Sequence, residues 1–248
     1  MKKKLLRDFF LIFGLFLAVL IYFIYNPVVD SEVIKVDYKD REAKIKEKLV
    51  ELLNFTKVKD GKTPILVALD KMQNLVQDST TTYELYFSNS GEVNAYALPG
   101  DMIVINRGLL LSSDKPEEII GVLAHELGHL KKKHITEQMI TSFSIALLFS
   151  GSGTTSGEVA KVLTQNVFSR EMESEADDYA IQKMNDIGIS PNHLAVLFKR
   201  LYTRTDHIPE FLSTHPGIDK RIKKFSKYNN TPDNIKIDFD WENAKKNL

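Results

Sequence analysis

Residues 114–133 of the 248-residue chain read DKPEEIIGVLAHELGHLKKK. Asp114 can cap a helix here, with Glu117 three residues on as its capping-box partner. Apolar residues recur at helical spacing behind this cap, which predicts one helix running to about Lys133. The pentad His125-Glu126-Leu127-Gly128-His129 lies in the middle of that helix.

The two histidines of the pentad can bind one metal ion. Residues four apart on a helix share a face, so His125 and His129 direct both imidazoles to one point, where a zinc ion can be held. Glu126 is rotated by about 100° from His125, which sets its carboxylate beside the metal rather than on it. There it can act as general base on a water molecule that zinc makes acidic. Gly128 costs a helix about 1 kcal/mol relative to Ala, which suggests close backbone packing beside the site.

A catalytic zinc ion needs a third protein ligand and an open position. One familiar zincin class places a third histidine six residues after the second, with a glycine between. Ile135 and Lys132 occupy those two positions, so that class is excluded. The obvious source of a third ligand is the acidic run at residues 169–178, SREMESEADD.

This acidic run offers two pairs of carboxylates at helical spacing. Glu173 and Asp177 share one side of a helix, whereas Glu171 and Glu175 share another. A run of acids is ordinarily a solvated helix face, but these acids do not follow the period of a single face. Spacing alone leaves the choice between the two pairs open.

Three segments of the chain together resemble one protein family. They are NAYALPGDMIVINRGLL at residues 94–110, HELGH at 125–129 and SREMESEAD at 169–177. Over roughly residues 80–225 the chain is similar to the membrane-associated zinc peptidases that include HtpX and the CAAX prenyl proteases. The resemblance implies that Glu173 is the third zinc ligand. It also implies that Asp177 either supports a zinc-bound histidine or acts as a proton donor.

Thr214-His215-Pro216, with Arg221 shortly after, also resembles a motif of this family, in its single-anchor, BepA-like branch. There the resemblance implies that His215 reaches the active site and can occupy the fourth position of the zinc ion. His134, His193 and His207 are expected to have no role at the site.

Three short strands are expected at residues 83–87, 93–98 and 102–106, separated by turn residues. The segment at 94–100 resembles the strand at the rim of the family's cleft, and an exposed strand edge can bind an extended peptide. Asp101 stands where the family usually has a second glycine, which changes the turn and leaves the catalytic prediction intact.

The first thirty residues predict a membrane anchor. Lys2, Lys3, Lys4 and Arg7 precede an uncharged run at residues 9–25 that covers roughly 26 Å as a helix. The basic flank should stay cytoplasmic, which places the following chain on the other side of the membrane. A cleaved signal peptide is the alternative, but the run is long for one and no small-x-small site follows it. A second apolar stretch at 139–149 is too short to span and is expected to be a buried or interfacial helix.

The composition bounds the remaining possibilities. The chain has 33 basic and 33 acidic residues, so no basic surface for nucleic acid is indicated. It has no cysteine, which excludes disulfides, thiolate zinc sites and a cysteine nucleophile.

The predicted fold class is α+β. We expect a mainly helical, zincin-type domain with a small three-stranded sheet, preceded by one N-terminal transmembrane helix. Residues 1–29 form the cytoplasmic flank and anchor, 30–228 the metallopeptidase domain, and 229–248 a polar C-terminal tail. Further helices are expected at about 41–55, after Pro64, at 166–184 and at 190–202.

The predicted function is zinc-dependent endopeptidase activity, with one Zn²⁺ per chain. His125, His129 and Glu173 are the expected ligands, and Glu126, Asp177 and His215 the expected catalytic groups. The expected partners are polypeptides, unfolded or misassembled envelope proteins in quality control, and no nucleic acid. The alternative is a chaperone-like peptide-binding protein with a mainly structural zinc site, which the general base Glu126 disfavours.

Overall fold

The computed structural model describes residues 42–43, 45–51, 53–77, 82–135, 168–203 and 209–248. By its contacts the chain divides into Met1–Arg41 and a compact unit, Glu42–Leu248, to which all the described residues belong. The anchor predicted at residues 9–25 and the apolar helix predicted at 139–149 lie outside the described residues. Within the described part, no helix combines the length and apolar character needed to cross a bilayer.

The sheet has four strands in the order β1-β2-β4-β3. They are β1 (Thr56–Lys57), β2 (Glu84–Ser88), β3 (Ala95–Leu98) and β4 (Met102–Asn106). β2 and β4 run parallel, and the two outer pairs are antiparallel. The prediction of three strands therefore missed β1. A strand of two residues is too short to show the alternation of apolar and polar residues by which a strand is recognised.

The sheet's pairing places β4 between β2 and β3, with β3 at an edge. Every residue of β4 is buried, as expected for a strand flanked on both sides. Pro99, Gly100 and Asp101 join β3 to β4, and Gly100 and Asp101 have φ of 80° and 52°. Two left-handed residues make the tight turn that suits a hairpin, and aspartate tolerates this conformation better than most side chains.

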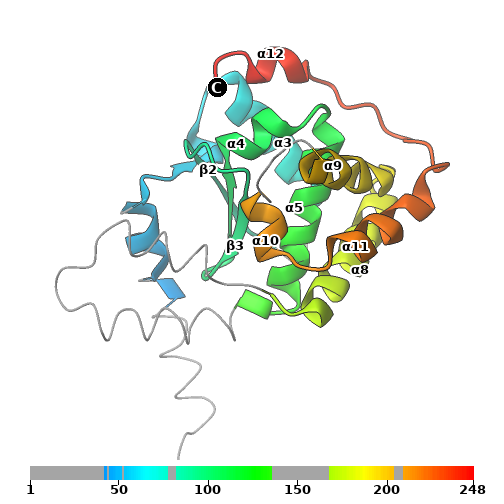
Figure 1. Ribbon diagram of the computed structural model, residues 1–248. Helices are drawn as coiled ribbons and strands as arrows, with labels where there is room; N and C mark the ends of the chain where they lie inside the picture. The colour runs from blue at the N-terminus through cyan, green and yellow to red at the C-terminus, as the bar shows by residue number, and fades with distance from the viewer. Residues whose placement is uncertain (1–41, 44, 52, 78–81, 136–167, 204–208) are drawn as a thin grey trace, which may run out of the picture. The chain divides into compact units, whose positions relative to one another are not determined.

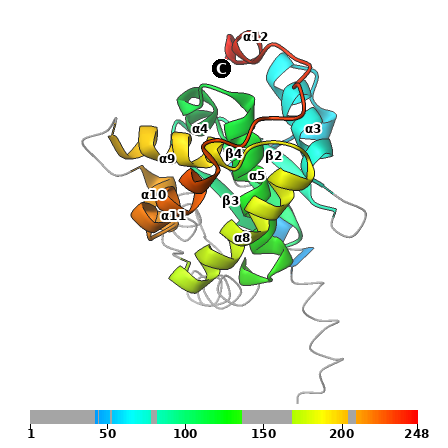
Figure 2. The ribbon, with the colours of Figure 1, turned by 90° about the vertical axis from the view of Figure 1, so that its right-hand side faces the viewer.

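Helices cover the sheet and surround α5 (Figures 1 and 2). Helix α5 packs against β3 and β4 on one side and against α8 and α9 on the other. The helices whose bounds lie within the described residues are α3 (Pro64–Val76), α4 (Arg107–Ser112), α5 (Pro116–Lys131), α8 (Arg170–Asp186), α9 (Asn192–Thr203), α10 (Glu210–Thr214), α11 (Ile218–Phe225) and α12 (Trp241–Lys245), with 3-10 turns η1 (Val58–Asp60) and η3 (Ser226–Tyr228). The mainly helical prediction is confirmed.

The start of α5 differs from the predicted cap. Lys115 is the N-cap residue and makes no side-chain cap bond. The backbone N–H of Asp114 donates instead to the carboxylate of Glu118 (2.9 Å), not of Glu117. Glu118 is buried and also pairs with Arg200 of α9. The prediction of a capping box with Glu117 was wrong by one residue, because a tertiary partner fixes Glu118.

Helices α5 and α8 approach closely at Gly128. A Cβ placed there would lie 3.0 Å from both the Cα and the carbonyl oxygen of Ala176. Any larger residue would force the two helices apart, so the close packing inferred from Gly128 is confirmed. This contact sets the distance between the histidine pair and the acidic run.

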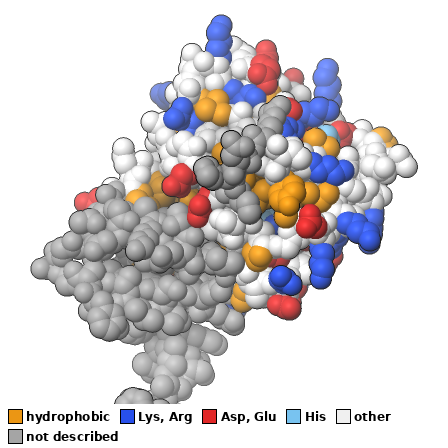
Figure 3. Space-filling view, in the orientation of Figure 1, with side chains coloured by type: hydrophobic (Ala, Val, Ile, Leu, Met, Phe, Trp, Pro, Cys, Tyr) orange, Lys and Arg blue, Asp and Glu red, His pale blue; other side chains and the backbone are white. Residues whose placement is uncertain are grey.

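The C-terminal residues pack onto the domain. The N–H of Asn234 donates to the carbonyl of Gly188 (2.7 Å), and Lys71 donates to the carbonyl of Asp238 (3.0 Å). Trp241 and Ala244 are buried against the main core. In Figure 2 this segment crosses the molecule to reach α3. On the face drawn in Figure 3, basic and acidic side chains are interspersed rather than gathered by sign.

Candidate metal centre

Helix α5 brings two imidazoles to one buried point. His125 and His129 are each fully buried, and their Nε2 atoms lie 3.1 Å apart. The four-residue spacing places them one turn apart on the face of α5 that meets α8. The phenyl ring of Phe168 stacks on His129, with ring centroids 3.9 Å apart.

Helix α8 supplies a carboxylate to the same point. Its first turn is fixed by Ser169, whose hydroxyl accepts from the N–H of Met172. Glu173 is buried, with its Oε2 3.4 Å from Nε2 of His125 and its Oε1 3.3 Å from Nε2 of His129. Glu171 and Glu175 are exposed. Of the two pairs that spacing left open, the structure brings Glu173 and Asp177 inward.

His215 completes the cluster from the turn after α10. Its Nδ1 lies 2.9 Å from Oε1 of Glu173 and 3.3 Å from Nε2 of His125. The ligand atoms of His125, His129, Glu173 and His215 all lie within 4.8 Å of one another. This is the only such cluster that the described residues form.

Glu126 lies beside the cluster without a hydrogen-bond partner among the described residues. Both of its carboxylate oxygens are buried and accept no hydrogen bond from any described residue. The nearest cation-forming group is Nε2 of His215, 3.6 Å from Oε1. A buried carboxylate without a hydrogen bond is costly, so its presence indicates a ligand, water or substrate at this position.

Arg221 of α11, which follows the Thr214-His215-Pro216 motif, is a site residue for which no role was predicted. It is buried, and its Nε and Nη2 donate to the two oxygens of Asp177 at 3.0 and 2.7 Å. Its Nη1 lies 2.8 Å from Oε2 of Glu173, and its guanidinium covers the ring of Phe198. The sequence KRIKK at 220–224 presents Arg221 among lysines, and no local pattern marks it as the buried one.

His134 is a second residue that the sequence placed outside the site. Its Nδ1 lies 3.0 Å from Nδ1 of His129, on the side of that ring facing away from the cluster. His193 pairs instead with Asp233, in agreement with its predicted absence from the site. His207 lies outside the described residues.

The electrostatics of the cluster show an excess of negative charge. Burial opposes protonation of His125, as does Arg221, but Asp177 and Glu173 outweigh them and raise its pKa to about 9. Burial holds the pKa of His129 well below its usual value. Burial alone would raise the pKa values of Glu173 and Asp177, but neighbouring imidazoles and Arg221 hold both below their usual range.

This charge excess fits a divalent cation. Glu126, Glu173 and Asp177 are three buried carboxylates against the single buried guanidinium of Arg221, which leaves two negative charges when the imidazoles are neutral. Imidazole and carboxylate are the donors that zinc accepts. The residues present therefore fit the predicted metal. Glu126 is not needed as a ligand.

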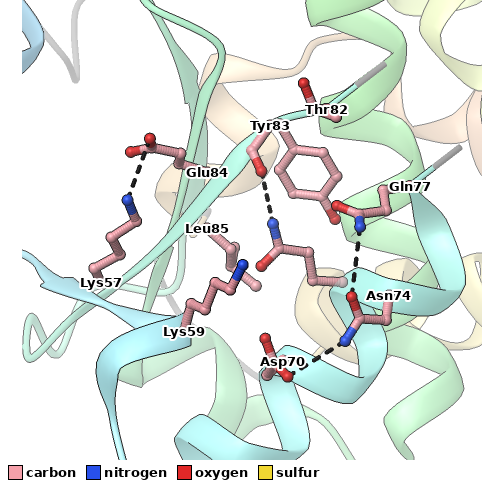
Figure 4. Close-up of a pocket in the computed structure, with 10 residues that line it drawn as sticks. Lys57, Lys59, Asp70, Asn74, Gln77, Thr82, Tyr83, Glu84 and Leu85 are labelled. Atoms are coloured by element: carbon pink, nitrogen blue, oxygen red, sulfur yellow. Dashed lines mark hydrogen bonds and ion pairs between the residues drawn. The ribbon is translucent and has the colours of Figure 1, made fainter. Parts of the chain in front are cut away.

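The cavities at the surface of the described residues include the following two. One, of about 410 Å³, lies between α8 and α11 and reaches Glu173, Asp177 and Arg221 from outside. The other, of about 330 Å³, lies between α3 and β2 (Figure 4). There the amide of Gln73 donates to the carbonyl of Tyr83 (2.6 Å), and none of the cluster residues lines it.

Comparison with known proteins places these features in context. The profile of Peptidase family M48 matches residues 66–229. The mitochondrial metalloendopeptidase OMA1 of Schizosaccharomyces pombe is 28% identical over 160 residues, 60% of this chain and 48% of that protein. The metalloprotease YcaL of Escherichia coli (strain K12) is 30% identical over 140 residues, 52% of this chain and 54% of that protein.

A third relative is longer still. The beta-barrel assembly-enhancing protease of Escherichia coli (strain K12) is 25% identical over 162 residues, 57% of this chain and 33% of that protein. The chain thus spans between a third and about half of the length of these curated relatives.

Proposed function

This chain belongs to peptidase family M48, and we propose on that premise that it is a zinc-dependent endopeptidase acting on exported or membrane proteins. The observation that carries the proposal is the position of Glu126. Its unpartnered, buried carboxylate adjoins a four-residue cluster that fits a metal ion. A purely structural metal site does not require a general base beside the metal.

His125, His129 and Glu173 would hold the zinc ion, with His215 beside the remaining position. What zinc supplies when bound is Lewis acidity towards the scissile carbonyl and towards water. The position of Asp177 supports a role in orientation, because its Oδ1 lies 3.1 Å from Nδ1 of His125. Arg221 keeps Asp177 ionised and in place.

Glu126 acts as the general base. It accepts a proton from the attacking water and delivers that proton to the leaving amine, so that one carboxylate serves both steps. Burial keeps other donors away from it, which preserves its capacity to accept. His215, 3.6 Å from Glu126, is placed to hydrogen-bond to the oxygen on which negative charge develops.

The edge strand β3 would align the substrate. It packs against α5 and has only one neighbour in the described sheet, β4. An extended polypeptide can add to such an edge through backbone hydrogen bonds. This favours unfolded segments over folded proteins as substrates.

The cellular role is proposed as quality control of envelope proteins. One relative is named for enhancing beta-barrel assembly, and residues 1–29 carry the basic flank and apolar run of an anchor. We place residues 30–228 on the extracytoplasmic side as the peptidase domain. Residues 229–248 belong with it, since Trp241 and Ala244 are buried in its core.

The test is proteolysis by the purified full chain. Unfolded casein should be cleaved, cleavage should stop with a strong chelator, and added zinc should restore it. Stoichiometric zinc binding without cleavage of any unfolded substrate would favour the chaperone-like alternative. If the chain binds no zinc at all, both the endopeptidase proposal and the chaperone-like alternative are contradicted.

A further inference from the structure

The end of α5 folds the chain back onto the metal centre. The helix ends at Lys131, and Lys133 adopts a left-handed conformation with φ of 59°. The N–H groups of Lys132 and Lys133 donate to the carbonyls of Gly128 and Leu130, which closes the last turn. His134 is thereby directed back along the helix and buried against His129.

The two rings meet through one specific pair of atoms. Nδ1 of His129 and Nδ1 of His134 are 3.0 Å apart, so one must donate and the other accept. Nε2 of His129 faces His125 and Glu173, where a metal ligand needs a free lone pair. The proton of a neutral His129 then belongs on Nδ1, and His129 is the donor.

This assignment fixes the tautomer of His134. Because its Nδ1 accepts, its own proton lies on Nε2, which is 3.5 Å from Oε2 of Glu175 on α8. The result is a chain of contacts from the cluster through His129 and His134 to Glu175. It also explains why His134 is not itself a ligand: its Nδ1 is engaged by Nδ1 of His129, and its Nε2 faces Glu175.

Among the described residues, no carboxylate contacts the outer nitrogen of His129, in contrast to that of His125. Asp177 holds Nδ1 of His125 at 3.1 Å, whereas Nδ1 of His129 has the His134 imidazole. The outer partner of a metal-ligating imidazole fixes its tautomer and ring orientation, and its loss typically costs about 10–100-fold in metal affinity.

We propose that His134 is a positioning residue, whose imidazole accepts the Nδ1 proton of His129 and so presents Nε2 of His129 to the metal. This inference rests on the proposed zinc site. It adds a residue to the site that neither the HELGH pentad nor the acidic run contains.

The test compares the zinc affinities of full-length variants by competition with a chromophoric chelator. His134→Ala removes the acceptor and should weaken zinc binding about 10–100-fold. His134→Asn keeps an amide oxygen near the position of Nδ1 and should restore binding to within about threefold of wild type. His193→Ala removes a histidine that pairs with Asp233 and should leave zinc affinity unchanged.

Folding is monitored separately, by circular dichroism and thermal unfolding of the chelated proteins. If His134→Ala does not fold, the comparison of His134→Asn with His134→Gln, whose longer side chain displaces the amide, takes its place. Wild-type affinity in His134→Ala, or equal weakening in the Asn and Ala variants, would overturn the proposal. Failure of the wild-type chain to bind zinc would instead overturn the proposed function.

Discussion

Arg221 donates to both carboxylate oxygens of Asp177, from Nε at 3.0 Å and from Nη2 at 2.7 Å. This fork is buried directly behind the proposed ligand His125. Arg221 also lies 2.8 Å from Glu173, so one guanidinium balances two of the three buried carboxylates. The charge of the site in the absence of metal therefore depends on a residue of α11.

The first prediction arises from that dependence. Arg221→Met leaves Asp177 and Glu173 buried without a counter-charge, and breaking a buried pair in this way costs about 3–5 kcal/mol. The free energy of unfolding of the chelated protein, measured in urea, should fall by that amount. Adding Asp177→Asn to Arg221→Met should recover part of the loss. No recovery would mean that Arg221 stabilises through its packing on Phe198.

The second prediction separates the base from the ligands. Glu126→Gln keeps the size of the side chain and removes its ability to accept a proton. Zinc stoichiometry should stay near wild type, while casein cleavage falls by orders of magnitude, at least the 10²–10⁴-fold range typical of a lost general base. Comparable turnover at equal zinc content would contradict the mechanism.

The third prediction concerns the acidic run of α8. Glu173→Ala should lose zinc under conditions in which Glu171→Ala retains it, because Glu173 is buried at the cluster and Glu171 is exposed. Asp177→Ala should bind zinc about 10–100-fold more weakly than wild type. Metal analysis of the dialysed proteins measures all three. Zinc retained by Glu173→Ala and lost by Glu171→Ala would reverse the assignment.

The fourth prediction tests an ion pair far from the metal. Burial tends to raise the pKa of Glu84, but Lys46, Tyr86 and Lys57 outweigh it and lower the pKa to about 2. A depressed carboxyl pKa stabilises the fold above the unfolded value, about 4.3, and this contribution is lost as the pH falls towards 2. Glu84→Gln should therefore destabilise the protein at pH 7 and much less at pH 2.5. Because Glu84 is partly exposed, the difference should stay near or below about 1 kcal/mol.

Urea unfolding of both proteins at the two pH values measures this difference. Glu92→Gln, an exposed carboxylate on the loop before β3, is the matched control. A difference between wild type and Glu84→Gln that is the same at both pH values would show that charge is not its source.

The sequence was most informative where residues with metal-binding chemistry recur at helical spacing. The pentad placed His125 and His129 on one helical face, and Gly128 indicated close backbone packing beside the site, which the structure shows to be with α8. Local pattern could not show which acidic pair turns inward, since both pairs have the same spacing. That choice depends on Ala176 packing against Gly128, which is a tertiary contact.

The residues whose roles sequence reasoning did not predict act through long-range or turn contacts. Arg221 reaches Asp177 across 44 positions of sequence. His134 meets His129 only because Lys133 takes a left-handed conformation, which its side chain does not predict. The two-residue strand β1 is defined by its pairing with β2, and a pattern that short has no period to read.

The last prediction concerns His215. Its Nδ1 lies 2.9 Å from Oε1 of Glu173, and its ring contacts those of His129, Phe168 and Phe211. Unlike the ligands of α5 and α8, it lies in a non-helical turn between the five-residue α10 and Gly217, whose φ is 87°. A ligand on such a turn can be withdrawn more easily than one on a packed helix. We therefore expect His215 to occupy the fourth position at rest and to leave it when substrate binds.

His215→Ala separates the two roles that this position allows. If His215 closes the resting site, the variant should retain zinc through three ligands and cleave casein faster than wild type at low substrate concentration. If His215 instead stabilises the developing oxyanion, zinc should be retained and kcat should fall, by about 10²–10³-fold for the loss of one such donor. Pro216→Ala, which changes the turn and keeps the imidazole, is the control for loop distortion. Unchanged activity together with unchanged zinc affinity in His215→Ala would show that His215 has no part in the mechanism. His215 lies 2.9 Å from Glu173, and if it closed the site or stabilised the oxyanion, its removal would change the activity or the zinc affinity.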